Sequence, residues 1–80
     1  MADNKTTTDT ALASYLVTEG YQIISIDYSQ PRFEYTFDRP ITELAAKYIS
    51  GNALTDPSDF IRVNKKLLRV IAKRLQWEED

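Results

Sequence analysis

The spacing of apolar residues changes along the chain, and each change marks a predicted element. In residues 8–20 the apolar positions lie three and four apart, which predicts an amphipathic helix. Thr8 or Asp9 is its candidate N-cap, and Gly20 can end it because glycine adopts the left-handed conformation without steric cost. The spaced positions are Ala11, Leu12, Tyr15, Leu16 and Glu19. Residues 1–7 are polar and aperiodic, and we expect them to be disordered.

From Tyr21 the period shortens to two, which is typical of strands. The alternation predicts an antiparallel hairpin whose loop, residues 29–32, contains Pro31. If Tyr28 faces Phe33 across this loop, every large apolar residue of both strands lands on one face. The predicted pairs are Tyr28 with Phe33, Ile26 with Tyr35, and Ile24 with Phe37.

A helical period returns after the hairpin. Asp38 or Arg39 is the candidate cap of this second helix, Pro40 lies in its first turn, and Gly51 ends it. A single apolar stripe along a helix is expected to face the core. The stripe consists of Ile41, Leu44, Ala45, Tyr48 and Ile49.

The last helical pattern is the longest and the most polarised. It begins at Asp56-Pro57, a cap followed by proline at the first helical position, and has no internal glycine or proline up to Trp77. We expect a helix of about 20 residues, roughly 30 Å long. Its predicted core side consists of Phe60, Val63, Leu67, Val70, Ile71 and Leu75, flanked by Ile61 and Leu68. The opposite side, an arc of roughly 100°, carries Arg62, Lys65, Lys66, Arg69 and Lys73.

These elements predict one small domain of the α+β class over residues 8–80, with the order α-β-β-α-α. A two-stranded hairpin is not stable alone, so helices must cover its apolar face. The long C-terminal basic amphipathic helix is the expected cover. No repeat or linker in the sequence suggests a second domain.

Composition removes several classes of function. The chain of 80 residues contains no Cys and no His, which excludes thiolate or imidazole metal sites, Cys nucleophiles and Ser-His triads. We expect no metal, no cofactor and no enzymatic activity. The polar N-terminus and the lack of a bilayer-length apolar run predict a cytoplasmic protein without signal peptide or membrane anchor.

Charge is unevenly distributed along the chain, and this distribution says more about a binding surface than the net charge does. The net charge is only -2, but residues 60–77 hold six basic residues and no acidic one. The last helix is therefore about +6 and the remaining chain about -8. An ordinary solvated helix commonly interleaves Glu with Lys at i,i+4, and this one does not.

This charge pattern defines the candidate binding site. A row of cations along two to three turns can follow a phosphate backbone or an acidic protein surface. Trp77 lies at the edge of this basic face, near Lys66, Arg69 and Lys73, and can stack on a base or anchor a protein partner. The alternatives are a merely solvated helix face and a Trp77 that folds back to cover the end of the core. The candidate binding residues are Arg62, Lys65, Lys66, Arg69, Lys73 and Trp77.

Two other constellations are better explained by structure than by function. The hairpin aromatics could form a base-stacking platform, but they are needed in the core, and the outer face carries Asp27 and Glu34, which repel phosphate. The pairs Asp56 with Asp59 and Asp27 with Glu34 could serve acid-base or metal chemistry. Helix capping and solvated strand positions account for them.

Three segments carry a resemblance to a known family. They are residues 16–21, residues 33–37, and residues 51–60 with Asp56-Pro57 inside. Over about Thr8 to Leu68 the chain resembles a small domain family of unknown function found in short proteins of phages, plasmids and other mobile elements. The resemblance implies a mobile-element setting and supplies no catalytic or binding residues.

The sequence thus favours a small non-enzymatic binding protein of a phage or mobile element. The first hypothesis is contact with the nucleic-acid backbone through the basic face of the last helix. The alternative is a protein-protein interaction module, either a homodimer or an inhibitor of a host protein, that uses the same helix and Trp77. An acidic host or phage protein is the partner expected in the second case.

Overall fold

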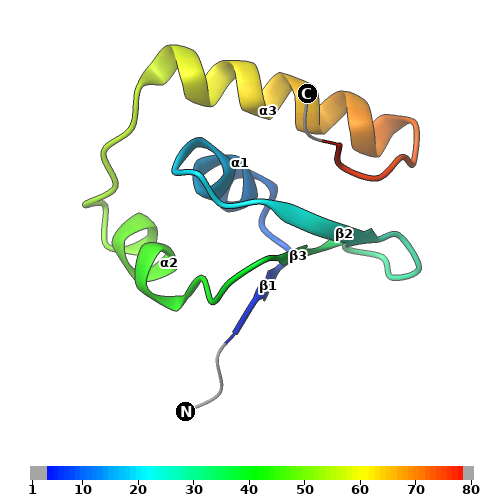
Figure 1. Ribbon diagram of the computed structural model, residues 1–80, viewed down its shortest axis with the longest axis horizontal. Coiled ribbons are helices and arrows are strands. Elements are labelled where there is room, and N and C mark those ends of the chain that lie inside the picture. The colour runs from blue at the N-terminus through cyan, green and yellow to red at the C-terminus, as the bar shows by residue number, and fades with distance from the viewer. Residues whose placement is uncertain (1–3, 79–80) are drawn as a thin grey trace.

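The computed structural model describes residues 4–78 and confirms a small α+β fold. Within these residues the chain forms three strands and three helices (Figure 1). They are β1 (Thr6–Thr7), α1 (Thr10–Thr18), β2 (Ile23–Asp27), β3 (Glu34–Phe37), α2 (Thr42–Ile49) and α3 (Pro57–Ala72). The predicted helices and hairpin are all present, with one strand more than expected.

Helix α1 is the central layer, between the sheet and α3 (Figure 1). Five consecutive residues of α1, from Leu12 to Leu16, are buried. A helix buried around its circumference can pack on two neighbours at once. Leu16 of α1, Tyr35 of β3 and Leu67 of α3 belong to one buried core. The expectation that the C-terminal helix covers the hairpin is therefore met only in part. Helix α3 packs mainly on α1 and reaches the hairpin at Tyr28, whose hydroxyl donates to the Val70 carbonyl at 3.4 Å.

The sheet has three antiparallel strands in the order β1-β3-β2. Thr6 pairs with Thr36 and Thr7 with Tyr35, so the prediction of disorder fails at these residues; residues 1–3 lie outside the described part of the chain. The backbone N–H of Phe37 also donates to the carbonyl oxygen of Lys5, at 2.8 Å. A two-residue polar strand shows no periodicity that the sequence pattern could reveal.

The hairpin register agrees with the prediction near the loop and differs from it at the start of β2. Ile26 pairs with Tyr35, and the rings of Tyr28 and Phe33 meet edge to face, with their centroids 4.9 Å apart. A bulge between Ile23 and Ser25 then shifts the ladder, so that Ile23 lies opposite Phe37. The bulge inserts one extra residue into β2, so the side chains that precede it point to the opposite face of the sheet from the one predicted. Ile24, predicted in the core, is consequently 62% exposed.

The helix starts and stops largely follow the sequence signals. The carboxylate of Asp9 accepts from the Leu12 N–H at 3.1 Å, and Gly20 has φ 97°. Helix α2 is different: its N-cap is Ile41, with no side-chain cap, and Pro40 precedes the helix. Ile49, on the predicted core stripe, is 80% exposed, since this short helix lies at the margin of the core.

Helix α3 begins as predicted and ends sooner. Asp56 caps the N–H groups of Ser58 and Asp59, and the helix stops at Ala72 after 16 residues. Arg74 follows in the left-handed conformation at φ 56°, and the Leu75 N–H donates back to the carbonyl of Val70. The chain therefore turns back before Trp77, and Leu75 is exposed rather than in the core.

Candidate functional site

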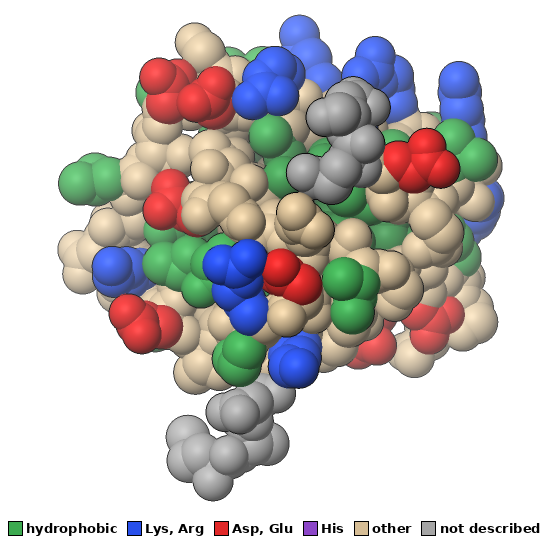
Figure 2. All heavy atoms as spheres, in the orientation of Figure 1, with side chains coloured by type: hydrophobic (Ala, Val, Ile, Leu, Met, Phe, Trp, Pro, Cys, Tyr) green, Lys and Arg blue, Asp and Glu red, His purple; other side chains and the backbone are tan. Residues whose placement is uncertain are grey.

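The candidate site lies on α3, whose inner side is fixed by the core. Val63 and Leu67 are buried, and Phe60, Val70 and Ile71 pack partly against the core. The 3.6-residue period then turns the basic positions away from α1. Figure 2 shows Lys and Arg side chains standing out along the edge of the molecule that α3 forms. Four of the five predicted cations are exposed and Lys66 is half-buried; the exposed ones are Arg62, Lys65, Arg69 and Lys73.

The structure divides the six predicted residues into two groups. Lys65 and Arg69 on the exposed side of α3, together with Lys73 at its C-cap, lie four residues apart and are here called the outer ridge. At 1.5 Å rise per residue, successive members are about 6 Å apart along the axis. Within residues 4–78, none of the three forms an ion pair. Among the described residues, the outer ridge is therefore a line of positive charge without an ion-pair partner.

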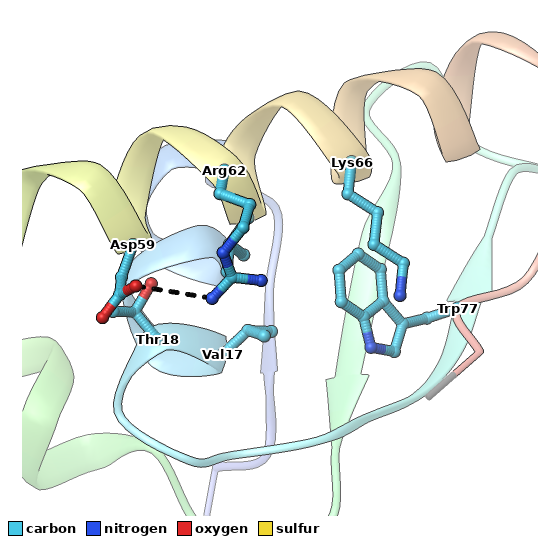
Figure 3. Close-up of a pocket in the computed structure, with 7 residues that line it drawn as sticks. Val17, Thr18, Asp59, Arg62, Lys66 and Trp77 are labelled. Atoms are coloured by element: carbon cyan, nitrogen blue, oxygen red, sulfur yellow. Dashed lines mark ion pairs between the residues drawn. The ribbon is translucent and has the colours of Figure 1, made fainter. Parts of the chain in front are cut away.

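The second group surrounds a pocket between α1 and α3 (Figure 3). Arg62 extends from α3 toward Val17 and Thr18 of α1, whereas Lys66 runs alongside the Trp77 ring on the other side of the pocket. The Arg62 guanidinium lies 3.5 Å from the Asp59 carboxylate, so part of its charge is compensated. The sequence pattern gave no sign of this pocket, because its walls come from segments distant along the chain.

Trp77 is not on the helix. It lies after the reversal at Arg74, is half-buried and packs against the core, which agrees with the alternative that it folds back. The Lys66 ammonium lies 4.4 Å from the Trp77 ring centroid, and it donates to the Glu78 carbonyl at 2.7 Å. Lys66 is thus engaged in holding the C-terminal segment.

Further contacts secure this segment to the sheet, and the sequence gave no signal for them. The Gln76 side chain bonds to the backbone of Ile26, and the Tyr28 hydroxyl donates to the Leu75 carbonyl. Burial raises the pKa of the Tyr28 hydroxyl. The Arg74 guanidinium lies over the Phe33 ring, 4.8 Å from its centroid. The segment after α3 is therefore part of the fold.

Beside the outer ridge runs a strip of exposed apolar residues, Ile61, Leu68 and Ala72, here called the apolar strip. Ile61 is 52% exposed and Leu68 47%. Leu68 and Ala72 line a shallow hollow together with Lys65 and Arg69. The apolar pattern predicts Ile61 and Leu68 at the margins of the core, but the buried residues Val63 and Leu67 lie on the other side of the helix.

Asp27 and Asp56, two of the carboxylates considered for acid-base or metal chemistry, have local structural roles. The Ser29 hydroxyl and N–H donate to the Asp27 carboxylate and lower its pKa. Asp56 is a helix cap. Among residues 4–78, no group of three or more acidic residues is placed to hold a metal ion, and no helix there is long and apolar enough to cross a membrane.

Comparison of the chain with protein-family models, with curated proteins and with solved structures finds no match.

Proposed function

We propose that the protein is a small non-enzymatic binding protein, of the kind that phages and other mobile elements encode, and that its outer ridge contacts the nucleic-acid backbone. The observation that carries this proposal is the ridge itself. Lys65, Arg69 and Lys73 are exposed, evenly spaced and without an ion-pair partner within residues 4–78. Phosphate oxygens are the nucleic-acid groups that Lys and Arg contact independently of sequence.

The division of the cations limits the strength expected of this contact. Arg62 is partly compensated by Asp59, and Lys66 is engaged with Trp77 and Glu78. Three cations rather than five thus remain for phosphate. Three neutralised phosphates give a slope of log K against log salt of about -2.7, or a loss of about 40-fold from roughly 50 to 200 mM salt.

Fluorescence anisotropy of labelled single- and double-stranded DNA and RNA, at these two salt concentrations, tests the proposal. The double variant Lys65→Glu/Arg69→Glu should abolish binding with an unchanged circular dichroism spectrum. Arg32→Glu/Lys47→Glu is the matched control, because it changes the net charge equally at exposed sites outside α3. Equal losses of binding in both variants would show that only the net charge matters. Retained binding in the α3 variant would refute the proposal.

A further inference from the structure

The apolar strip of α3 has no role in the proposed contact with nucleic acid. Phosphate contact needs cations, whereas Ile61 and Leu68 each leave about half of their surface in water. Exposed apolar side chains that recur on one side of a helix, here seven residues apart, mark an interaction surface when charged residues border them. Lys65 and Arg69 provide that border.

The hollow in this strip has the geometry of a helix-binding hole. Its lining residues, Lys65, Leu68, Arg69 and Ala72, lie at i, i+3, i+4 and i+7. Four residues in such a diamond on one helix form the hole that receives an apolar side chain of a facing helix. Ala72 is the small corner that leaves room for the incoming side chain.

We infer that α3 docks an acidic amphipathic helix of a partner protein. One apolar residue of that helix enters the hole, and a second packs near Ile61. Acidic residues that flank its apolar side meet Lys65 and Arg69, in the way that charged positions beside a coiled-coil seam select their partner. The positive charge of α3 therefore favours a partner helix with negative charge.

A second copy of this chain fits the strip less well. If two copies of α3 faced each other, the Lys65 and Arg69 of one would approach those of the other, and the like charges would repel. If the strip of one copy instead met an acidic surface elsewhere on the next, the contact would be heterologous and would build rings or open chains rather than a simple symmetric dimer. An acidic heterologous partner avoids both difficulties.

The inference stands apart from the proposed function, although the two share residues. Lys65 and Arg69 belong both to the outer ridge and to the hole, so nucleic acid and the partner helix cannot bind α3 together. Leu68 belongs to the hole alone. Substitutions at this position therefore separate the two activities.

The test uses a labelled synthetic helix of about 20 residues, with leucines at alternating three- and four-residue spacing and glutamates beside them. Its counterpart carries lysine at each glutamate position. The acidic peptide should bind the full-length chain, and the basic counterpart should not. Leu68→Ser should weaken binding by about tenfold, because it removes the apolar wall of the hole. The same variant should leave nucleic-acid binding unchanged.

Ile49→Ser is the matched control, since it removes an equally exposed apolar side chain from α2. Failure of the acidic peptide to bind, or equal loss in the Ile49 variant, would overturn the inference. A wild-type chain that sediments as a dimer and becomes monomeric with Leu68→Ser would identify a second copy as the occupant and also overturn it. A matching loss of nucleic-acid binding in the Leu68 variant would assign the strip to nucleic acid instead.

Discussion

The side-chain amide of Gln76 pairs with the backbone of Ile26, 50 residues away along the chain. The Ile26 N–H donates to Gln76 Oε1 at 2.7 Å, and Gln76 Nε2 donates to the Ile26 carbonyl at 2.9 Å. These are the two bonds that one residue of a neighbouring antiparallel strand would make. A single side chain thus joins the segment after α3 to strand β2.

Gln76→Ala should lower the free energy of unfolding by about 1–2 kcal/mol, because two hydrogen bonds are lost. Urea denaturation measures this change, and hydrogen exchange should show faster exchange of the Ile26 amide. Gln22→Ala, at another exposed glutamine, is the control and should change neither quantity. An unaltered Ile26 exchange rate in the Gln76 variant would contradict the role assigned to the amide.

Lys66→Met should alter the environment of Trp77, the only tryptophan of the chain. The ammonium lies 4.4 Å from the ring centroid, and a cation-π contact of this exposure contributes about 0.5–1 kcal/mol. We expect a shifted Trp77 emission maximum and increased acrylamide quenching. Lys65→Met removes a neighbouring cation that points elsewhere and should leave the emission unchanged. Identical spectra for both variants would place Trp77 away from Lys66.

Ser14 and Asn64 should be energetically coupled, because they form a hydrogen bond between α1 and α3. The fully buried Ser14 hydroxyl donates to Asn64 Oδ1 at 2.9 Å. A double-mutant cycle of Ser14→Ala with Asn64→Ala should give a coupling energy of about 0.5–1.5 kcal/mol by urea denaturation. Thr18→Ala, which removes a hydroxyl bonded within α1, should combine additively with Asn64→Ala. Additivity in the Ser14 cycle would rule out the bond.

Asp38 should make the stability depend on pH in the acid range. The Arg39 guanidinium donates to both oxygens of its carboxylate, at 3.1 and 2.9 Å, and lowers its pKa. Because the folded-state pKa lies below the unfolded value of about 4, this stabilisation is complete above pH 4 or so. It is lost as the pH falls through the folded pKa.

Thermal unfolding between neutral and acid pH measures this dependence. The melting temperature of Asp38→Asn should be lower than that of the wild type at neutral pH, and the difference should shrink on acidification. Arg39→Met should also reduce the difference, since it removes the largest cause of the lowered Asp38 pKa. A gap of constant size at all pH values would show that Asp38 acts by some means other than its charge.

The sequence predicted the elements whose signals are local. Asp56-Pro57 marks the start of α3, Gly20 marks the end of α1, and alternation gives the strand pair that joins Ile26 to Tyr35. Each of these features depends on a few neighbouring residues. They could therefore be read without knowledge of the rest of the fold.

What could not be predicted depends on contacts between distant segments. The bulge that exposes Ile24 arises in the pairing of two strands, not in either strand alone. The end of α3 is set by Arg74, a non-glycine residue in a conformation that favours glycine, whose guanidinium lies over Phe33. No rule of helix termination would select arginine there. The placement of Trp77 follows from that turn.

The candidate site shows the same division. Helical spacing predicted that the cations gather on one side of α3, and Lys65, Arg69 and Lys73 lie there. It could not show that Lys66 holds the Glu78 carbonyl, since that contact requires the chain to return. Helical spacing also predicted Leu68 at the margin of the core, but the core does not extend to this side chain, which is exposed.

The strand order β1-β3-β2 has a consequence for how the protein behaves at high concentration. Unpaired strand edges invite joining with the edges of other molecules, and short or covered edges resist it. Here β1 is only two residues long, and Gln76 occupies the backbone groups of Ile26 on β2. The C-terminal segment thus helps to keep this small sheet from growing into aggregates.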